Sequence, residues 1–128
     1  LQADGGTRTA AISGGWVATV LALETLRRRG ALAALPLRLA VAAVSCGVVG
    51  DALLLDLAYA EDAGAAVDVN VVMAGDGRLI EVQGTAERQP FARATLAALL
   101  DLAETGIQQL FATQRQALAA ARQPVVWP

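Results

Sequence analysis

Gln2-Ala3-Asp4-Gly5-Gly6-Thr7-Arg8-Thr9-Ala10 is the stretch that decides the fold, because it ends a strand, turns on two glycines and opens a long helix. The first backbone N–H groups of a helix have no partner within it and lie at the positive end of the helix dipole, so this turn can hold an anion. Thr7 adds a hydroxyl group, and Arg8 adds a guanidinium group that can bind two phosphate oxygens. An ordinary two-glycine turn with a threonine cap is the alternative interpretation.

The helix that follows is expected to run from about Thr7 to Arg29. Apolar side chains recur every three or four residues and predict one buried face, made of Ile12, Trp16, Val20, Leu23 and Leu26. Arginines at 27–29 stand in the last turn, where positive charge complements the helix dipole, and Gly30 can take the left-handed cap. A contact between these arginines and RNA is the alternative use of the charge.

Four strands are predicted after this helix, at residues 39–49, 52–59, 67–73 and 79–83. The first is almost continuously apolar, as expected for a strand buried on both faces, and it contains Cys46 as a core residue. Gly50-Asp51 is a two-residue hairpin signal, Gly75-Asp76-Gly77 is a second turn, and a loop is expected at 60–66. Gly84-Thr85-Ala86-Glu87 is expected to break the last strand.

A final helix is expected from about Phe91 to Arg122. Gly106 within it indicates a bend or a close packing contact. The tail at 123–128 contains prolines, cannot continue the helix and is expected to fray. These elements predict a single α+β domain at 1–122, with a mostly antiparallel sheet packed with two long helices. The apolar stripe of the final helix comprises Leu96, Leu99, Leu100, Ala103, Ile107, Leu110, Phe111 and Leu118.

The composition excludes several kinds of active site. The 128 residues include one cysteine, no histidine and no lysine, since all ten basic residues are arginine. A Ser-His-Asp triad, a Walker-type phosphate loop, Schiff-base chemistry and a histidine metal site each need a residue type that is absent. The chemistry that remains is that of carboxylates, arginine, hydroxyl groups and the backbone.

Charge and hydropathy limit the partners that we expect. Proteins that bind nucleic acid normally have a basic surface, whereas this chain has a net charge of −2. We therefore do not expect this region to bind RNA unaided. Its uncharged apolar runs fall short of the roughly 20 residues of a membrane span, and no signal segment is visible. We expect no membrane partner and a cytoplasmic location.

Two carboxylates in the middle of the chain form a second candidate site. Asp62 lies in the loop before the third strand, and Asp68 lies on that strand six residues later. A compact turn between them would bring both carboxylates to one cleft, where a hard cation such as Mg²⁺ would relieve their repulsion. A solvated turn residue beside a strand-edge residue is the alternative interpretation.

The chain from Leu1 to about Ala120 resembles the C-terminal half of the ribonuclease PH family, which is related to polynucleotide phosphorylase and the exosome ring subunits. The resemblance implies the fold of the second domain of ribosomal protein S5. It also implies a further half ahead of this run, with strands that pair with those present and another arginine for phosphate. The matching segments are QADGGTRTA at 2–10, AVSCGVV at 43–49, DLAYAED at 56–62, VDVNVVM at 67–73, EVQGTAE at 81–87 and LAETGI at 102–107.

The resemblance implies a phosphorolytic 3′-to-5′ exoribonuclease that trims RNA 3′ ends, usually in tRNA maturation and rRNA processing, as a hexameric ring built as a trimer of dimers. Inorganic phosphate would be the nucleophile, and nucleoside diphosphates would be released. Gly6, Thr7 and Arg8 match the family's phosphate-binding run, and Asp62 and Asp68 match its catalytic pair of acidic residues. Mg²⁺ or Mn²⁺ is the metal that the resemblance implies at this pair.

Several points stay open at the level of sequence. Holding the metal and giving a proton to the leaving ribose oxygen are two roles for Asp62 and Asp68, and the sequence does not say which residue has which role. Asn70 lies near the position of a lysine in polynucleotide phosphorylase and is expected to line the site. The alternatives to an active enzyme are a non-catalytic ring subunit, an RNA-binding structural relative and an inactive fragment.

Overall fold

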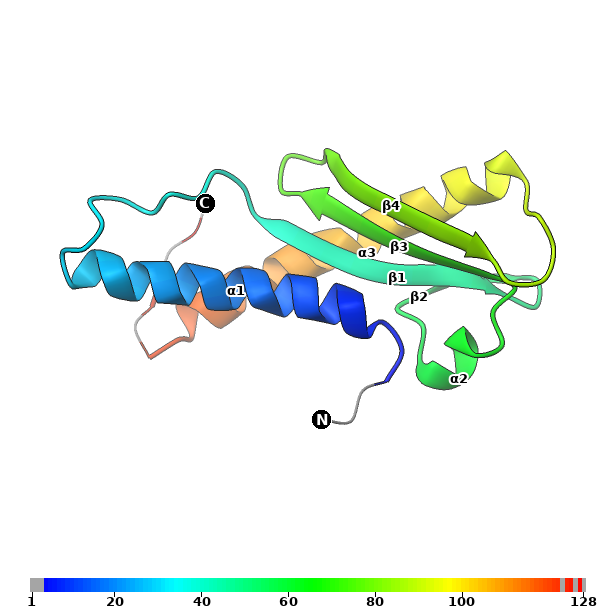
Figure 1. The fold of residues 1–128 in the computed structure, drawn as a ribbon, viewed down its shortest axis with the longest axis horizontal. Coiled ribbons are helices and arrows are strands. Elements are labelled where there is room, and N and C mark those ends of the chain that lie inside the picture. Colours follow the sequence, from blue (N-terminus) through cyan, green and yellow to red (C-terminus); the bar gives the residue numbers. More distant parts are fainter. Residues whose placement is uncertain (1–3, 123, 126, 128) are drawn as a thin grey trace.

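The computed structural model describes residues 4–122, 124, 125 and 127. It has a four-stranded antiparallel sheet in the order β2-β1-β3-β4, with α3 across one face and α1 beside β1 (Figure 1). The predicted α+β architecture, two long helices packed on a mostly antiparallel sheet, is confirmed. In chain order the elements are α1 (Thr7–Arg28), β1 (Val41–Val49), β2 (Ala52–Leu55), α2 (Tyr59–Asp62), β3 (Val67–Ala74), β4 (Leu79–Ala86) and α3 (Arg93–Ala119).

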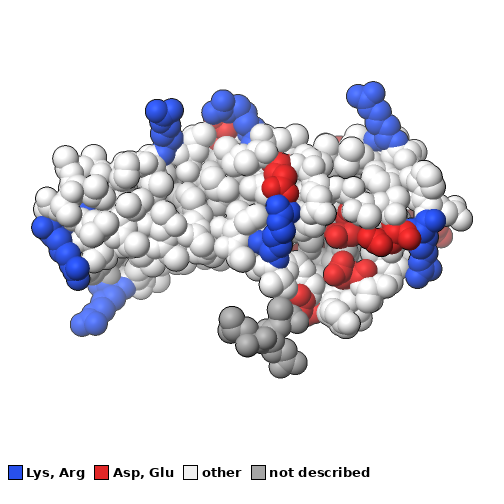
Figure 2. Space-filling view, in the orientation of Figure 1, with Lys and Arg blue, Asp and Glu red and all other residues white. Residues whose placement is uncertain are grey.

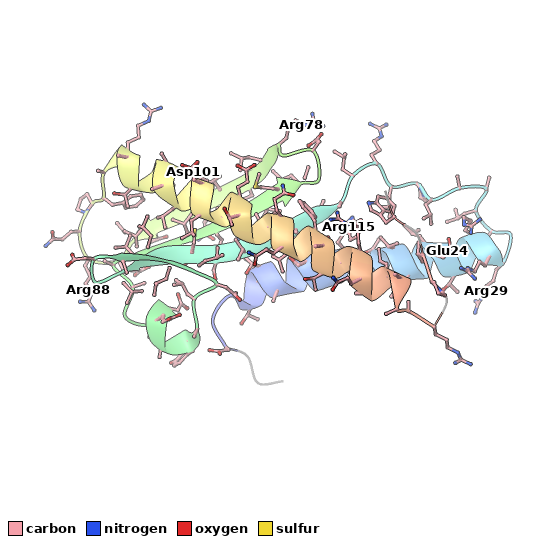
Figure 3. All side chains as sticks on the ribbon, turned by 180° about the vertical axis from the view of Figure 1, so that it is seen from behind. Glu24, Arg29, Arg78, Arg88, Asp101 and Arg115 are labelled. Atoms are coloured by element: carbon pink, nitrogen blue, oxygen red, sulfur yellow. The ribbon has the colours of Figure 1, made fainter. Side chains whose placement is uncertain are left out.

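The apolar core lies between the sheet and α3, which crosses the sheet in Figure 3. Successive residues of a strand point to opposite faces, so Cys46 and Val69 enter the core while their neighbours face the other side. Ser45 pairs in register with Asn70, next to Asp68 on the same face of β3. The pairing of β1 with β3 therefore groups polar residues on the face away from α3. The buried residues of α3 are Leu99, Ala103, Gly106, Ile107, Phe111, Gln114 and Leu118.

Side chains from the two long helices close the open edge of β1. This edge is free because β2 is short and pairs only with the end of β1. The hydroxyl of Ser13 donates to Ala43 O at 3.1 Å and accepts from Ala43 N at 2.9 Å. Gln114 Nε2 donates to Val41 O at 2.9 Å. Buried peptide groups need such partners, so these polar side chains stabilise the strand edge.

The predicted apolar face of α1 is only partly right. Trp16 and Val20 are buried as expected, whereas Leu26 is exposed. The helix turns a more polar face inward because it packs against a strand edge, whose peptide groups require hydrogen-bonding partners. The buried residues of α1 are Thr9, Ser13, Trp16, Val20 and Glu24.

The second strand is shorter than predicted. It ends at Leu55 rather than Tyr59, because Asp56 takes a left-handed conformation with φ of 57°. The N–H of Asp56 donates to Ser45 O at 2.7 Å, and the chain leaves the sheet after this hydrogen bond. The short helix α2 then replaces the strand end and loop that the sequence predicted. The carboxylate of Glu61 accepts a hydrogen bond from Ala58 N, at the N-cap of α2, at 2.8 Å.

The fourth strand is longer than predicted. The expected break at 84–87 is wrong, since β4 continues through Gly84 to Ala86. These residues stay paired with β3, where Thr85 lies opposite Asp68. The hairpin at Gly50-Asp51 is confirmed, because Val49 pairs with Ala52 across it.

The close contact predicted at Gly106 is confirmed. A Cβ atom at this position would lie 2.8 Å from a side-chain carbon of Leu55. The absence of a side chain on α3 therefore lets β2 approach the helix. Cys46, predicted to be a core residue, is fully buried there.

The end of α1 and the C-terminal tail are joined by an ion cluster. The carboxylate of Glu24 accepts from Arg27 Nε at 2.7 Å and from Arg28 Nε at 2.6 Å, and Arg28 also donates to Pro124 O at 2.9 Å. Trp127 packs edge-on against Trp16, with ring centroids 5.1 Å apart. The prediction of a frayed tail is thus wrong at 124, 125 and 127, while 123, 126 and 128 lie outside the described residues.

By length and composition alone, α1 is apolar enough to cross a membrane, which the expectation from uncharged runs did not anticipate. Two observations bear on its place in this fold. Trp16 and Val20 pack against Leu118 and Val125. The hydroxyl group of Ser13 donates a hydrogen bond to the backbone oxygen of Ala43 in β1. These contacts bury one side of α1, and 28% of its most apolar 18-residue stretch is buried.

Candidate active site

One cavity of about 230 Å³ contains all five of the predicted site residues. Its lining residues come from the start of α1, the polar face of the sheet and the end of α2, and these elements lie near one another in Figure 1. Segments that are far apart in sequence therefore converge on one hollow of the size of a small anion with its ligands. The lining residues are Asp4, Gly5, Gly6, Thr7, Arg8, Ser45, Asp62, Asp68 and Asn70.

The helix start is built so that its peptide groups face the cavity. Gly6 occupies the N-cap with φ of 65°, a conformation that suits glycine, and no side chain caps the helix. The backbone N–H groups of Arg8 and Thr9 donate to no acceptor in the part of the chain that the structure describes. Gly5 passes so close to the loop after β2 that a Cβ atom there would lie 2.1 Å from Leu57 O. The positive end of α1 is consequently open to an anion.

Asp4 fixes this loop against α2. Its carboxylate accepts from Gly5 N at 2.9 Å and also from Tyr59 N. These two backbone hydrogen bonds lower the pKa of the Asp4 carboxyl. The hydroxyl of Thr7 donates to Asp4 O at 2.8 Å, so its proton points into the loop rather than toward a ligand.

Arg8 lies at the cavity but is held by β4. Its Nη2 atom donates to both carboxylate oxygens of Glu81, at 2.5 and 2.7 Å, and its Nη1 atom donates to Gln83 at 3.2 Å. Gln83 Oε1 also accepts from Asn70 Nδ2 at 3.4 Å. The pair of Arg8 and Glu81 is about half exposed, so the guanidinium group remains accessible to an anion in the cavity.

The two aspartates meet across a short turn. Asp62 ends α2 and Asp68 is the second residue of β3, and both line the cavity. Burial raises the pKa of the Asp68 carboxyl, and the nearby charges of Asp62 and Glu87 raise it further. Figure 2 shows acidic side chains gathered on the half of this face that holds the sheet. Carboxylates that repel one another in this way are suited to share a proton or a cation.

A metal ion in this cavity would need carboxylate ligands. Within the described residues, no group of three or more histidine, cysteine, aspartate or glutamate side chains is arranged to hold a metal ion. Mg²⁺ commonly binds through one or two carboxylates together with phosphate oxygens and water. Asp62 and Asp68 fit that requirement, because both carboxylates line the cavity, and burial and then the charge of Asp62 raise the pKa of the Asp68 carboxyl.

Sequence reasoning missed two residues of the site. Ser45 stands within an apolar strand, and only the register of β1 against β3 puts it beside Asn70. Its side chain lines the cavity, is 3% exposed and has an Oγ atom without a hydrogen-bond partner among the described residues. Glu81 opens the matching segment at 81–87, and its partnership with Arg8 depends on a contact across 73 residues. Neither position carries a local signal that would have identified it.

Cys46, next to Ser45 in sequence, faces the opposite side of the sheet. Burial raises the pKa of its thiol to about 11, with a further contribution from the charge of Asp68. Its Sγ atom lies 3.6 Å from Leu99 O, to which the thiol donates. The thiol therefore stays protonated within the core and takes no part in the cavity.

Comparison with known proteins identifies the family. Residues 40–106, just over half of the chain, match the profile described as the 3′ exoribonuclease family, domain 2. The chain belongs to this family. Ribonuclease PH of Parasynechococcus marenigrum is 55% identical over 121 residues, and that of Moorella thermoacetica is 58% identical over 118 residues. These alignments cover 94% and 92% of this chain, and 49% and 47% of the relatives.

This member of the 3′ exoribonuclease family spans about half the length of the curated relatives that it matches. Its fold is similar to a crystal structure of rice (Oryza sativa) Rrp46, with a TM-score of 0.73 and 19% identity over 91% of this chain and 50% of that one. An Archaeoglobus fulgidus exosome structure with RNA bound to the active site gives a TM-score of 0.55 and 18% identity, over 69% of this chain and 35% of that one. At these identities the likeness concerns the fold.

Proposed function

We propose that this chain is the C-terminal part of a phosphorolytic exoribonuclease that removes nucleotides from RNA 3′ ends. The observation that carries the proposal is the single cavity that unites the start of α1 with Asp62 and Asp68. An anion-binding helix terminus opposite a carboxylate pair is what an attack by phosphate on a phosphodiester requires. The identity with ribonuclease PH relatives supports this reading over other uses of the same cavity.

In the proposed reaction, inorganic phosphate lies against the first peptide groups of α1 and the Arg8 guanidinium. A phosphate oxygen attacks the phosphorus atom of the last phosphodiester, and the bond from that phosphorus to the 3′ oxygen of the preceding nucleotide breaks. The products are a nucleoside diphosphate and an RNA shortened by one nucleotide. Arg8 offsets the negative charge that accumulates on the transferred phosphoryl group.

The leaving 3′ oxygen needs a proton, and the aspartates are the groups in the cavity that can supply one. Asp68 is the better candidate for this role, because burial, and then the charges of Asp62 and Glu87, raise the pKa of its carboxyl. Asp62 would hold Mg²⁺ or Mn²⁺ together with phosphate oxygens and water, so that Asp68 keeps its proton, and the metal, when bound, supplies positive charge to phosphate oxygens at the reacting centre.

The proposal includes a wider setting for the full-length protein. We propose tRNA 3′ ends as the substrate, a homohexameric ring as the assembly and the cytoplasm as the location. The exposed apolar residues of the edge strand β4, Leu79, Ile80 and Val82, support an interface with another part of such a particle.

The proposal is tested with the full-length protein, an RNA oligonucleotide labelled at its 5′ end, inorganic phosphate and Mg²⁺. We expect stepwise shortening from the 3′ end, and at least a tenfold lower rate in Asp62→Asn and in Asp68→Asn. Arg8→Ala should instead mainly raise the KM for phosphate, because it removes a charge-assisted contact with the nucleophile. Rates equal to wild type in both aspartate variants would remove these residues from the mechanism.

A further inference from the structure

We propose that Ser45 is a further ligand-binding residue of this cavity, and that its hydroxyl group donates a hydrogen bond to an oxygen of the phosphate group held at the start of α1. The inference rests on the proposed function and assigns a role to a residue outside the predicted site. The ligand chemistry is a tetrahedral phosphate oxygen, which belongs either to inorganic phosphate or to the phosphodiester of RNA.

The hydroxyl group of Ser45 is buried and unsatisfied. Ser45 is 3% exposed, and its Oγ atom has no hydrogen-bond partner among the described residues. Buried polar atoms nearly always have partners, and an exception needs a reason. A ligand that binds in the cavity lined by Ser45 supplies that reason.

Ser45 lies against the N-terminus of α1. A Cβ atom placed on Gly6 would lie 3.1 Å from Ser45 Oγ, so the hydroxyl group lies directly against the N-cap. Because the N-cap is glycine, no side-chain oxygen competes for the first peptide N–H groups. The hydroxyl and these peptide groups therefore converge on the same space.

The hydroxyl groups of the neighbouring threonines already have acceptors. Thr7 Oγ1 donates to Asp4 O at 2.8 Å, and Thr9 Oγ1 donates to Gly6 O at 2.8 Å. Ser45 thus provides the free hydroxyl donor at this cavity, within the part of the chain that the structure describes. Its backbone is held in place, since Ser45 O accepts from Asp56 N at 2.7 Å.

Ser13 provides a matched control for Ser45. Both serines are buried, but the hydroxyl of Ser13 is fully engaged by the backbone of Ala43 and does not line the cavity. Ser13→Ala should lower the melting temperature and leave the KM for phosphate unchanged. Ser45→Ala should not lower the melting temperature, because it removes an unsatisfied group from the free protein. It should raise the KM of the ligand that Ser45 contacts, because it removes a hydrogen bond from the complex.

The experiment uses the full-length protein and has two kinetic arms, one varying inorganic phosphate at saturating RNA and the other varying RNA at saturating phosphate. Loss of a hydrogen bond to a charged ligand predicts a rise of roughly tenfold in the KM of the ligand that Ser45 contacts. A rise in the phosphate arm assigns the contact to the nucleophile, and a rise in the RNA arm assigns it to the phosphodiester. No change in either arm would overturn the proposal, whatever the melting temperature does.

Two further measurements keep the proposal separate from folding and from the proposed function. Ser45→Cys keeps the size of the side chain and a weak donor, so it should raise the same KM by less than Ser45→Ala does, and an unchanged value would contradict the proposal even if Ser45→Ala did not fold. Binding of inorganic phosphate without RNA is measured by calorimetry. If wild type binds phosphate but releases no nucleoside diphosphate, the proposed function fails, while weaker phosphate binding by Ser45→Ala still supports the contact.

Discussion

The guanidinium group of Arg8 is bound by the carboxylate of Glu81, 73 residues further along the chain, with Nη2 to oxygen distances of 2.5 and 2.7 Å. This pair joins the first turn of α1 to β4 at the rim of the cavity. A surface ion pair contributes little to stability, because both groups are also well solvated. Its importance lies in the orientation of Arg8 and in the negative charge that it places beside an anion site.

The first prediction concerns that charge. Glu81→Gln keeps a hydrogen-bond acceptor for Arg8 and removes a like charge from the neighbourhood of phosphate. Repulsion of this kind near a protein surface is on the order of 1 kcal/mol, so the KM for phosphate should fall a few-fold in steady-state assays at low salt. The effect should shrink at high salt, because screening weakens it. A higher KM would show that the carboxylate of Glu81 acts mainly by orienting Arg8, and not through its own negative charge.

The second prediction concerns the loop that shapes the cavity. Gly5→Ala should lower the stability by about 1–3 kcal/mol and reduce activity, since the new methyl group would meet the backbone oxygen of Leu57 at 2.1 Å. Gly14→Ala, on the open side of α1, is the matched control, because nothing lies within 4 Å of an added Cβ atom. It should raise stability by up to about 1 kcal/mol through helix propensity. Melting temperatures check both, and equal effects would contradict the close approach at Gly5.

How far the sequence predicted the molecule depends on whether the signal was local. The helix start at Gly6 and the buried strand at 41–49 were found because glycine turns and apolar runs are local patterns. The inward face of α1 was misread because a strand edge selects polar residues such as Ser13. The end of β2 was missed because it depends on the left-handed conformation of Asp56, which a glycine more commonly adopts.

The residues of the site were also predicted where the signal was local and missed where it was not. Asp62 and Asp68 were predicted to meet because a turn of a few residues joins them, and they do line one cavity. Ser45 and Glu81 were missed because strand register and a contact between distant elements bring them to the site. Pairing partners of that kind are set by the whole fold and leave no pattern in their own neighbourhood.

The third prediction is a pH dependence from Glu24. Hydrogen bonds from Arg27 and then Arg28 lower the pKa of its carboxyl from 4.5 to about 2. The unfolded chain therefore binds a proton between these values that the folded chain does not, so this stabilisation is complete above pH 4.5 and is lost as the pH falls to about 2.

Urea unfolding of wild type and Glu24→Gln across this range tests the dependence. The difference in unfolding free energy should shrink as the pH falls, because protonated glutamate and glutamine are alike in charge. Glu104→Gln, at an exposed position of α3 with no ion pair among the described residues, is the control for removing a carboxylate outside the cluster. A constant difference for Glu24→Gln would contradict the role of the ion cluster.

The fourth prediction concerns the edge strand β4. It pairs on one side with β3, and its exposed residues include Leu79, Ile80 and Val82. An exposed apolar edge tends to pair with another chain, so the 128-residue chain alone should self-associate in sedimentation velocity experiments. Ile80→Lys should reduce this association, whereas Leu26→Lys, at an exposed position of α1, should not. A monomeric wild-type chain at high concentration would contradict the prediction.

The central claim is that the cavity uses inorganic phosphate, and not water, to cleave RNA. The most direct measurement follows radiolabelled inorganic phosphate during the reaction of the full-length protein with unlabelled RNA. The account predicts that the label enters the released nucleotide as the terminal phosphate of a nucleoside diphosphate, and that Asp68→Asn slows this transfer at least tenfold. Release of unlabelled nucleoside monophosphates at the same rate with or without phosphate would contradict it.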